Sequence, residues 1–490
     1  MFKAVILIFL FDLSLSPLLG NTAKNILNAF EKAQSLYHLG HYEEGLLHLQ
    51  SNSSSLQYED HLKFKLYEAK YNISLKQFLR AEEVLLDLSS HNFLHKGNIH
   101  DTFEKYLLLI EIGLFKDRRE MASIYLDSAQ TLRKKIKDKS LLFNFYKLKA
   151  TFLSKYSNYL SALIAFNRAK EHINSKQDTL SFNLIYSDLL INQRKLKDAE
   201  KIILESLLRI GKSERDKISR INFLLSLGFL KYIRNDSKRA LEVFHEAKEK
   251  IHSYKSRNKN LYDFLECEYS RLILYPLSDL SNTKQIIINC KNFLELAPNF
   301  IKANHYRFGE VYQKLANSYL TNSQISSFLK YSRLAINILD RSGRPRKDVL
   351  HTKIRYYFYV EDYYSCLNEI SEYHERFQSY TIDYESHTEI LIFKLLSNYR
   401  MKNFYELENI INNELRSPKP KYLSNNFFHK AYIVVLCNMI ECLITNDHTR
   451  SEEQNSKFKS ALDSIYHEEI RTPSDIGRLS IFYQIKLINY

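Results

Sequence analysis

The histidines are the side chains most able to bind a metal, and their spacing argues against a metal site. His38 and His41 lie three residues apart, and His91 and His95 lie four apart. Neither pair has carboxylates near it at the spacing that a zinc site needs. GxSxG, HExxH, P-loop and GxGxxG patterns are missing as well, and glycine is rare. We therefore predict no catalytic residue, no metal and no cofactor, and a protein that is not an enzyme.

The cysteines are the other candidates for chemistry, and all five lie in the second half of the chain: Cys267, Cys290, Cys366, Cys437 and Cys442. None forms a C-x-x-C pair, and the last two are too irregularly spaced for zinc. Cys290 and Cys366 fall where the repeat described below places small or apolar core residues. We predict that these two are buried free thiols.

Composition narrows the fold class. The 490 residues include only 10 Gly and 7 Pro, against average usage of about 7% and 5%. This scarcity argues against β-hairpins, glycine-rich phosphate loops and long flexible linkers. Hydrophobic residues make up 45% and charged residues 26%, which is ordinary for a folded protein. An almost purely helical chain is the simplest interpretation.

The elements that must position these residues are helix pairs that recur along the chain. The best-formed pair is Leu148 to Ile173, in which Tyr159, Ala162 and Phe166 fall on one face of a helix. Small residues in second helices recur between 36 and 41 residues apart. They are Gly45, Ala81, Ala122, Ala162, Ala199 and Ala240. Six such steps in register predict a helical repeat.

These residues resemble the tetratricopeptide repeat family, whose unit is a pair of antiparallel helices with a small residue in each. The small residue of the first helix matches at Ala33, Ala69, Ala150 and Gly228, and Ile110 replaces it in the third unit. The resemblance covers Ala23 to about Ile251. It implies an all-α fold, an α-solenoid of stacked antiparallel helix pairs in a right-handed superhelix.

The chain divides into four parts by pattern. Residues 1–20 are expected to be a signal peptide or an N-terminal anchor, because Lys3 precedes an apolar run. Regular repeats are expected over 21–254. Degenerate repeats with larger anchor residues, a seventh to a tenth pair, are expected over 255–425. Residues 426–490 are expected to form capping helices.

The resemblance also implies where a partner would bind. In this family the first helices line the concave side, which commonly holds peptide segments. By helix phase those positions include Asn144, Lys147, Thr151, Asp188, Asn192, Arg355 and Tyr359. Ordinary solvated surface is the alternative for each of them.

The net charge of +14, from 70 basic and 56 acidic residues, suggests a second surface. Basic clusters follow the second helices, and in a solenoid they would line one edge as a basic rim. The rim residues are Arg133, Lys134, Lys135, Arg344, Arg346 and Lys347. The rim could meet an acidic partner, nucleic acid or an anionic envelope polymer, or it could complement the helix dipoles. We prefer the dipole interpretation, and no base-reading motif supports nucleic acid.

Together these features predict a non-enzymatic helical-repeat protein that binds a protein or peptide. The signal-like start and the Lys/Asn/Tyr-rich style resemble exported sensor or regulator ectodomains of the Bacteroidetes type. This resemblance implies an exported, periplasmic or secreted scaffold or a sensory input module for signal transduction. The alternatives are an envelope protein that binds a polymer or glycan and an N-terminally membrane-anchored intracellular scaffold. Beyond the N-terminal segment we expect no transmembrane span.

Overall fold

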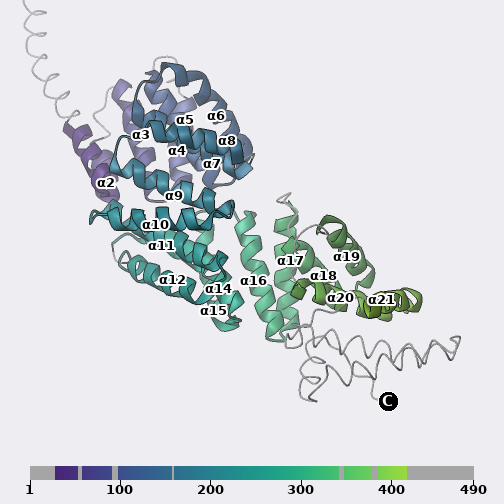
Figure 1. Cartoon of the computed structure of the whole chain (residues 1–490). Helices are drawn as coiled ribbons and strands as arrows, with labels where there is room; N and C mark the ends of the chain where they lie inside the picture. Colours follow the sequence, from purple (N-terminus) through teal and green to yellow (C-terminus); the bar gives the residue numbers. More distant parts are fainter. Residues whose placement is uncertain are drawn as a thin grey trace, which may run out of the picture. The chain divides into compact units, whose positions relative to one another are not determined.

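The computed structural model describes residues 28–52, 58–90, 98–156, 159–255, 257–341, 347–377 and 384–416, and the regular elements in these ranges are helices (Figure 1). The predicted signal segment 1–20 and the predicted caps 426–490 lie outside these ranges. The all-α prediction is confirmed. Within the described residues, no helix has the length and apolar character that crossing a membrane would require.

The helices follow one another as antiparallel pairs, which confirms the predicted stacking of pairs. The first helices are residues 28–39, α3 (Tyr58–Ser74), α5 (Ile99–Phe115), α7 (Lys139–Tyr156), α9 (Lys176–Asn192), α11 (Glu214–Ile233), α13 (Lys259–Leu272), α16 (Tyr306–Thr321), α18 (Lys347–Tyr359) and α20 (Tyr384–Arg400). The second helices are α2 (Tyr42–Asn52), α4 (Phe78–Ser90), α6 (Arg119–Leu132), α8 (Tyr159–Glu171), α10 (Leu196–Arg209), α12 (Ser237–His252), α15 (Thr283–Leu296), α17 (Ile325–Arg341), α19 (Tyr363–Phe377) and α21 (Phe404–Arg416). Short helical segments complete the set: η3 (Arg133–Lys135), α14 (Leu274–Asp279) and η4 (Ala297–Asn299).

The chain forms two compact units. Unit 1 comprises Met1–Asn282 with Lys291–Ala303, and unit 2 comprises Thr283–Cys290 with Asn304–Tyr490. The division falls along α15. The regular repeats predicted for 21–254 belong to unit 1, so the change in anchor residues near 254 and the division into units are separate features.

The small residues that align the repeats are points of close helix contact. Those without exposed surface are Ala33, Ala69, Ala81, Ala122, Ala150, Ala162, Ala199 and Ala240. At Gly228 of α11, an added Cβ would lie 2.9 Å from the Phe244 ring of α12. Because real Cβ contacts are longer, the pair can approach this closely only with glycine there. The repeat alignment therefore identifies packing positions.

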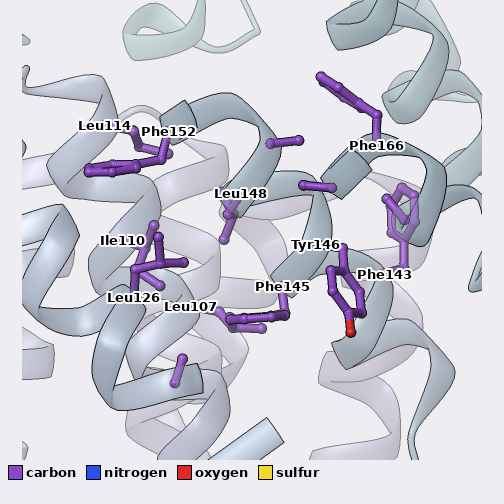
Figure 2. Close-up of a cluster of buried hydrophobic side chains, with 14 of the residues drawn as sticks. Leu107, Ile110, Leu114, Leu126, Phe143, Phe145, Tyr146, Leu148, Phe152 and Phe166 are labelled. Carbon is purple, nitrogen blue, oxygen red and sulfur yellow. The ribbon is translucent and has the colours of Figure 1, made fainter. Parts of the chain in front are cut away.

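Large aromatic side chains fill the space around these contacts (Figure 2). In the fourth pair, Phe143, Phe145 and Phe166 have no exposed surface and pack with Leu148 and Ala162. Burying an aromatic or aliphatic side chain of this kind contributes roughly 1.5–3 kcal/mol. The core of this pair thus lies between its two helices, as the Leu148–Ile173 pattern predicted.

The described turns inside the pairs repeat one backbone geometry. A residue in the left-handed region ends the first helix at Lys76, Asp117, Arg194, Asn235, Ser281, Ser323, Glu361 and Lys402, with Gly40 in the first pair. The next amide then donates back across six residues, as from Lys195 to the Leu190 carbonyl at 2.9 Å. This is the Schellman pattern, which satisfies the last helix carbonyls. The same Schellman motif therefore forms every described turn of this kind.

Unit 1 curves until its later helices meet its first three pairs. The Arg215 guanidinium at the start of α11 lies 5.9 Å from the centre of the Tyr37 ring. Ile218, one turn further on, packs against the core of the first pair. In α13, Phe264 lies 5.7 Å from Phe115 of α5, between ring centres. The surface inside this curve is therefore concave and enclosed by protein.

Unit 2 packs its pairs around larger anchors. Ala316 of α16 and Phe328 of α17 belong to one core cluster with Leu395 of α20 and Leu407 of α21, and each of these residues is fully buried. The eighth to tenth pairs predicted from the sequence are thus present as helix pairs. In unit 1, the first helix of the predicted seventh pair is interrupted at Ile273, which separates α13 from α14.

Candidate functional site

The first helices of unit 1 form its inner layer. α3, α5, α7, α9 and α11 each pack against the next first helix in the chain. Their faces turned away from the second helices line the concave side, which we call the inner face of unit 1. Four polar residues predicted from helix phase lie on α7 and α9, and a fifth, Asn192, ends α9.

Asp188 is the most perturbed carboxylate of this face. Ser226 of α11 donates a hydrogen bond to its Oδ1 at 3.1 Å. The side chain is exposed, yet burial among surrounding protein raises its pKa from 3.8 to about 6, against the opposing effect of the Ser226 bond. A carboxylate that is accessible and poorly solvated at once belongs to a concave surface.

Lys147 of α7 is a desolvated cation on the inner face. Its ammonium donates to the Ser181 hydroxyl of α9 at 3.4 Å. Burial lowers the pKa of Lys147 and Arg215 adds to the lowering, whereas Glu111 and Asp178 oppose it. Charges from α5, α9 and α11 therefore act on one ammonium, which shows that these helices converge on the inner face.

The remaining predicted positions of unit 1 are amides and a hydroxyl. The Thr151 hydroxyl donates to the Lys147 carbonyl at 2.9 Å, one turn back along α7. Asn144 is half-buried on the same helix, and Asn192 is exposed one turn beyond Asp188. These groups add donors and acceptors to the inner face without adding charge.

A cluster of three aromatic rings on α11 and α14 was not predicted from the sequence. The Phe229 ring lies 6.1 Å from that of Tyr232 and 5.6 Å from that of Tyr275, and the two tyrosine rings lie 5.5 Å apart, between centres. All three side chains are half-buried. The available signal was that Phe229 follows Gly228 as Asp188 follows Ser187, so the two occupy the same repeat position.

The predicted positions in unit 2 are arranged differently. Arg355 of α18 donates two hydrogen bonds to Glu389 of α20, at 2.9 and 2.6 Å, and one to Asn317 of α16 at 2.9 Å. His351 lies 2.9 Å from the same carboxylate. Tyr359 is buried, with its ring edge-on to Phe328. Arg355 and Tyr359 therefore make contacts between helices inside unit 2.

The predicted basic rim is described only in part. Arg133 is bonded to the Tyr146 hydroxyl, while Lys134 and Lys135 are exposed in η3. The Lys347 ammonium lies 5.9 Å from the Tyr373 ring centre. Arg344 and Arg346 lie outside the described residues, so the rim stays a prediction.

The cysteine prediction is confirmed. Cys290 and Cys366 are buried free thiols, as is Cys267. Burial raises the pKa of Cys290 above its ordinary range and that of Cys366 to about 12, which makes these thiols poor nucleophiles. In the ranges that the structure describes, His, Cys, Asp and Glu side chains form no group of three that could hold a metal ion.

Comparison with known proteins concerns the helical architecture alone. No family model and no curated protein sequence matches the chain. The chain is similar to a signal transduction ATPase with numerous domains (STAND) and a tetratricopeptide repeat sensor from Pyrococcus horikoshii, at 13% identity over 78% of the chain and a TM-score of 0.48. It spans about half of that protein, 55% of its length.

Two shorter structures are similar over nearly their whole length. A Rap protein complexed with competence and sporulation factor matches 84% of the chain and 98% of its own length, at 12% identity and a TM-score of 0.37. The P58(IPK) TPR domain matches 77% of the chain and 99% of its own length, at 10% identity and a TM-score of 0.27.

Proposed function

We propose that this chain is a non-catalytic helical-repeat protein whose unit 1 inner face binds an extended peptide segment of a partner protein. The observation that carries the proposal is Asp188, a carboxylate that is accessible and yet desolvated enough for its pKa to rise to about 6. An isolated protein gains no stability from such a group. A ligand that contacts it would gain from a strong local field.

The chemistry of the surrounding positions suits a peptide. Asn144 and Asn192 each offer amide donors and an acceptor, which complement the alternating N–H and C=O groups of an extended backbone. Lys147 and Asp188 add one charge of each sign on neighbouring helices. Enclosure by the curve of unit 1 would exclude water from a bound strand and strengthen these bonds.

The cellular setting is part of the same proposal. The signal-like segment 1–20 supports an exported scaffold or sensory input module. N-terminal sequencing of the mature protein from its native cells tests this point. A new N-terminus near residue 21 is expected, and an intact Met1 would contradict export.

Peptide selection tests the binding site directly. Phage displaying random twelve-residue peptides would be selected on the full chain, and enriched peptides would be titrated by fluorescence anisotropy. We expect Lys147→Ala and Asp188→Asn to weaken binding by about tenfold each, which corresponds to roughly 1.4 kcal/mol.

The matched controls lie on the exposed side of α10. Lys201→Ala and Glu205→Gln remove the same charges from a second helix and should leave binding unchanged. The proposal fails if no peptide is enriched, or if the α10 variants weaken binding as much as the inner-face variants do.

A further inference from the structure

We propose that the inner face of unit 1 contains a subsite for a cationic side chain of the ligand, a lysine or an arginine, formed by Asp188 and the aromatic cluster of Phe229, Tyr232 and Tyr275. The inference deepens the proposed function and rests on it for the nature of the ligand. It specifies that one position of the bound peptide carries a lysine or an arginine.

The repeat register brings the two parts of the subsite together. Ser187 and Gly228 are both buried against their second helices, so the residues that follow them, Asp188 and Phe229, occupy equivalent positions on α9 and α11. The hydrogen bond from Ser226 to Asp188 fixes the two helices side by side at this level. Phe229 lies three residues beyond Ser226, on the same face of α11.

The aromatic cluster supplies surfaces that favour a cation. Its rings meet at tilted and edge-on angles of 31°, 37° and 63°, so they do not cover one another in a parallel stack. A cation over an aromatic face within about 6 Å is attracted by the negative face of the ring. Half-buried rings beside a carboxylate combine both attractions at one place.

In the described part of unit 1, no basic side chain forms an ion pair with the Asp188 carboxylate. Burial and the Ser226 hydroxyl set its pKa, and no described basic side chain contributes. Glu82, by contrast, has Lys116 and Arg118 each at 2.5 Å. Glu200 is similarly paired with Lys231 at 2.5 Å. Glu82 and Glu200 thus form ion pairs within the protein, whereas the Asp188 carboxylate is available to a cation of a ligand.

A metal ion fits this position poorly. Calcium takes six to eight oxygen ligands and magnesium demands an octahedral set, whereas Asp188 is one carboxylate beside aromatic rings. The Ser226 bond uses Oδ1, and a carboxylate has about four acceptor positions. Room for a guanidinium or ammonium donor therefore remains on the carboxylate itself.

The test uses a matched pair of small probes on the full chain. Nα-acetyl-arginine amide and its neutral isostere Nα-acetyl-citrulline amide would be titrated and followed by saturation-transfer difference NMR. We expect arginine amide to bind at millimolar concentration and citrulline amide to bind about tenfold more weakly, since one charge-assisted contact of about 1.4 kcal/mol is lost.

Variants locate the effect. Asp188→Asn should reduce arginine binding to the citrulline level, and Phe229→Leu should weaken it severalfold. Glu205→Gln on α10 should leave it unchanged. Circular dichroism and the unfolding midpoint verify that each variant folds. The inference is overturned if the two probes bind alike, if arginine amide does not bind, or if Asp188→Asn binds arginine as the original chain does.

These outcomes separate the subsite from the proposed function. Selected peptides that need Lys147 and Asn192 but contain no required basic residue would overturn the subsite and keep peptide binding. Arginine binding that depends on Asp188, in a chain that enriches no peptide, would support the cation subsite and overturn peptide binding.

Discussion

The first helices of the two units each carry a carboxylate, and its surroundings differ between the units. In unit 1 the carboxylate of Asp188 is bonded to a neutral hydroxyl, and burial raises its pKa to about 6. In unit 2 the carboxylate of Glu389 is buried more deeply, yet Arg355 and His351 outweigh its desolvation and lower its pKa to about 2. One unit leaves its charge accessible, and the other neutralises it internally.

This difference distinguishes polar groups that join the helices of a repeat from polar groups that stay accessible. Arg355 joins three consecutive first helices, because Asn317 lies on α16 and Glu389 on α20. Nearby, Gln313 donates to Thr352 at 2.7 Å and joins α16 to α18 once more. Polar groups that join neighbouring helices in this way stabilise unit 2 and are not available to a ligand. This contrast supports our proposal that recognition takes place on unit 1.

The largest predicted effect comes from breaking the buried pair of unit 2. Glu389→Gln leaves the Arg355 guanidinium buried without its counter-charge, which should cost about 3–5 kcal/mol of unfolding free energy. Urea unfolding followed by circular dichroism measures it. The equivalent change in unit 1, Asp188→Asn, should cost nothing, and equal losses in both variants would abolish the comparison.

A smaller effect is expected from the close approach of helices in unit 1. Gly228→Ala places a Cβ 2.9 Å from the Phe244 ring, so the pair must separate slightly. Overpacking of this kind costs about 1–3 kcal/mol. Thermal unfolding checks this value, with Lys201→Ala, on the exposed side of α10, as the control. A neutral Gly228→Ala variant would show that α11 and α12 are not closely packed.

Asp188 and Glu389 should affect the pH dependence of the unfolding free energy with opposite signs. The folded pKa of Asp188 is raised from 3.8 to about 6, so its ionisation opposes folding and stability falls as pH rises through that window. The folded pKa of Glu389 is lowered from 4.5 to about 2, so its contribution is present above pH 4.5 and is lost as pH falls towards 2.

Paired unfolding curves between pH 3 and 7 test these signs. Asp188→Asn should be more stable relative to the original chain at pH 7 than at pH 4. For Glu389→Gln the deficit should be large at pH 7 and shrink in acid. The same slope in both variants would contradict the assignment of opposite shifts.

The smallest effect concerns the shared turn and should be the same in both units. Arg194 and Ser323 have φ of 58°, a conformation that costs a non-glycine residue about 1–2 kcal/mol. Arg194→Gly and Ser323→Gly should each stabilise by roughly 0.5–1 kcal/mol after the entropic cost of glycine. Unfolding midpoints measure both, with Lys197→Gly inside α10 as a destabilised control.

The sequence predicts the local parts of this fold well because its signals are local. Ala150 and Ala162 identify one pair, and the same spacing locates the others. The contact of Phe264 with Phe115 is not predictable in this way, because it depends on small rotations summed over several pairs. The return of α11 to the first pair, through Ile218, has the same origin.

The candidate site was predicted only where helix phase decides it. Asp188 follows from its position after a buried repeat residue, so its exposure was foreseeable. Tyr359 was placed by the same rule, but the larger anchors of unit 2 leave space that its ring fills beside Phe328. Tyr275 was missed because it lies on α14, beyond the break at Ile273.

The most direct test of the central claim is the location of a bound ligand. A selected peptide carrying a benzophenone amino acid would be cross-linked to the full chain by light, and the modified residues would be identified by mass spectrometry. Cross-links on α7, α9 and α11, around Lys147, Asp188 and Phe229, are the predicted result. Cross-links on α18 and α20, or on the exposed faces of second helices, would contradict the assignment of recognition to the inner face of unit 1.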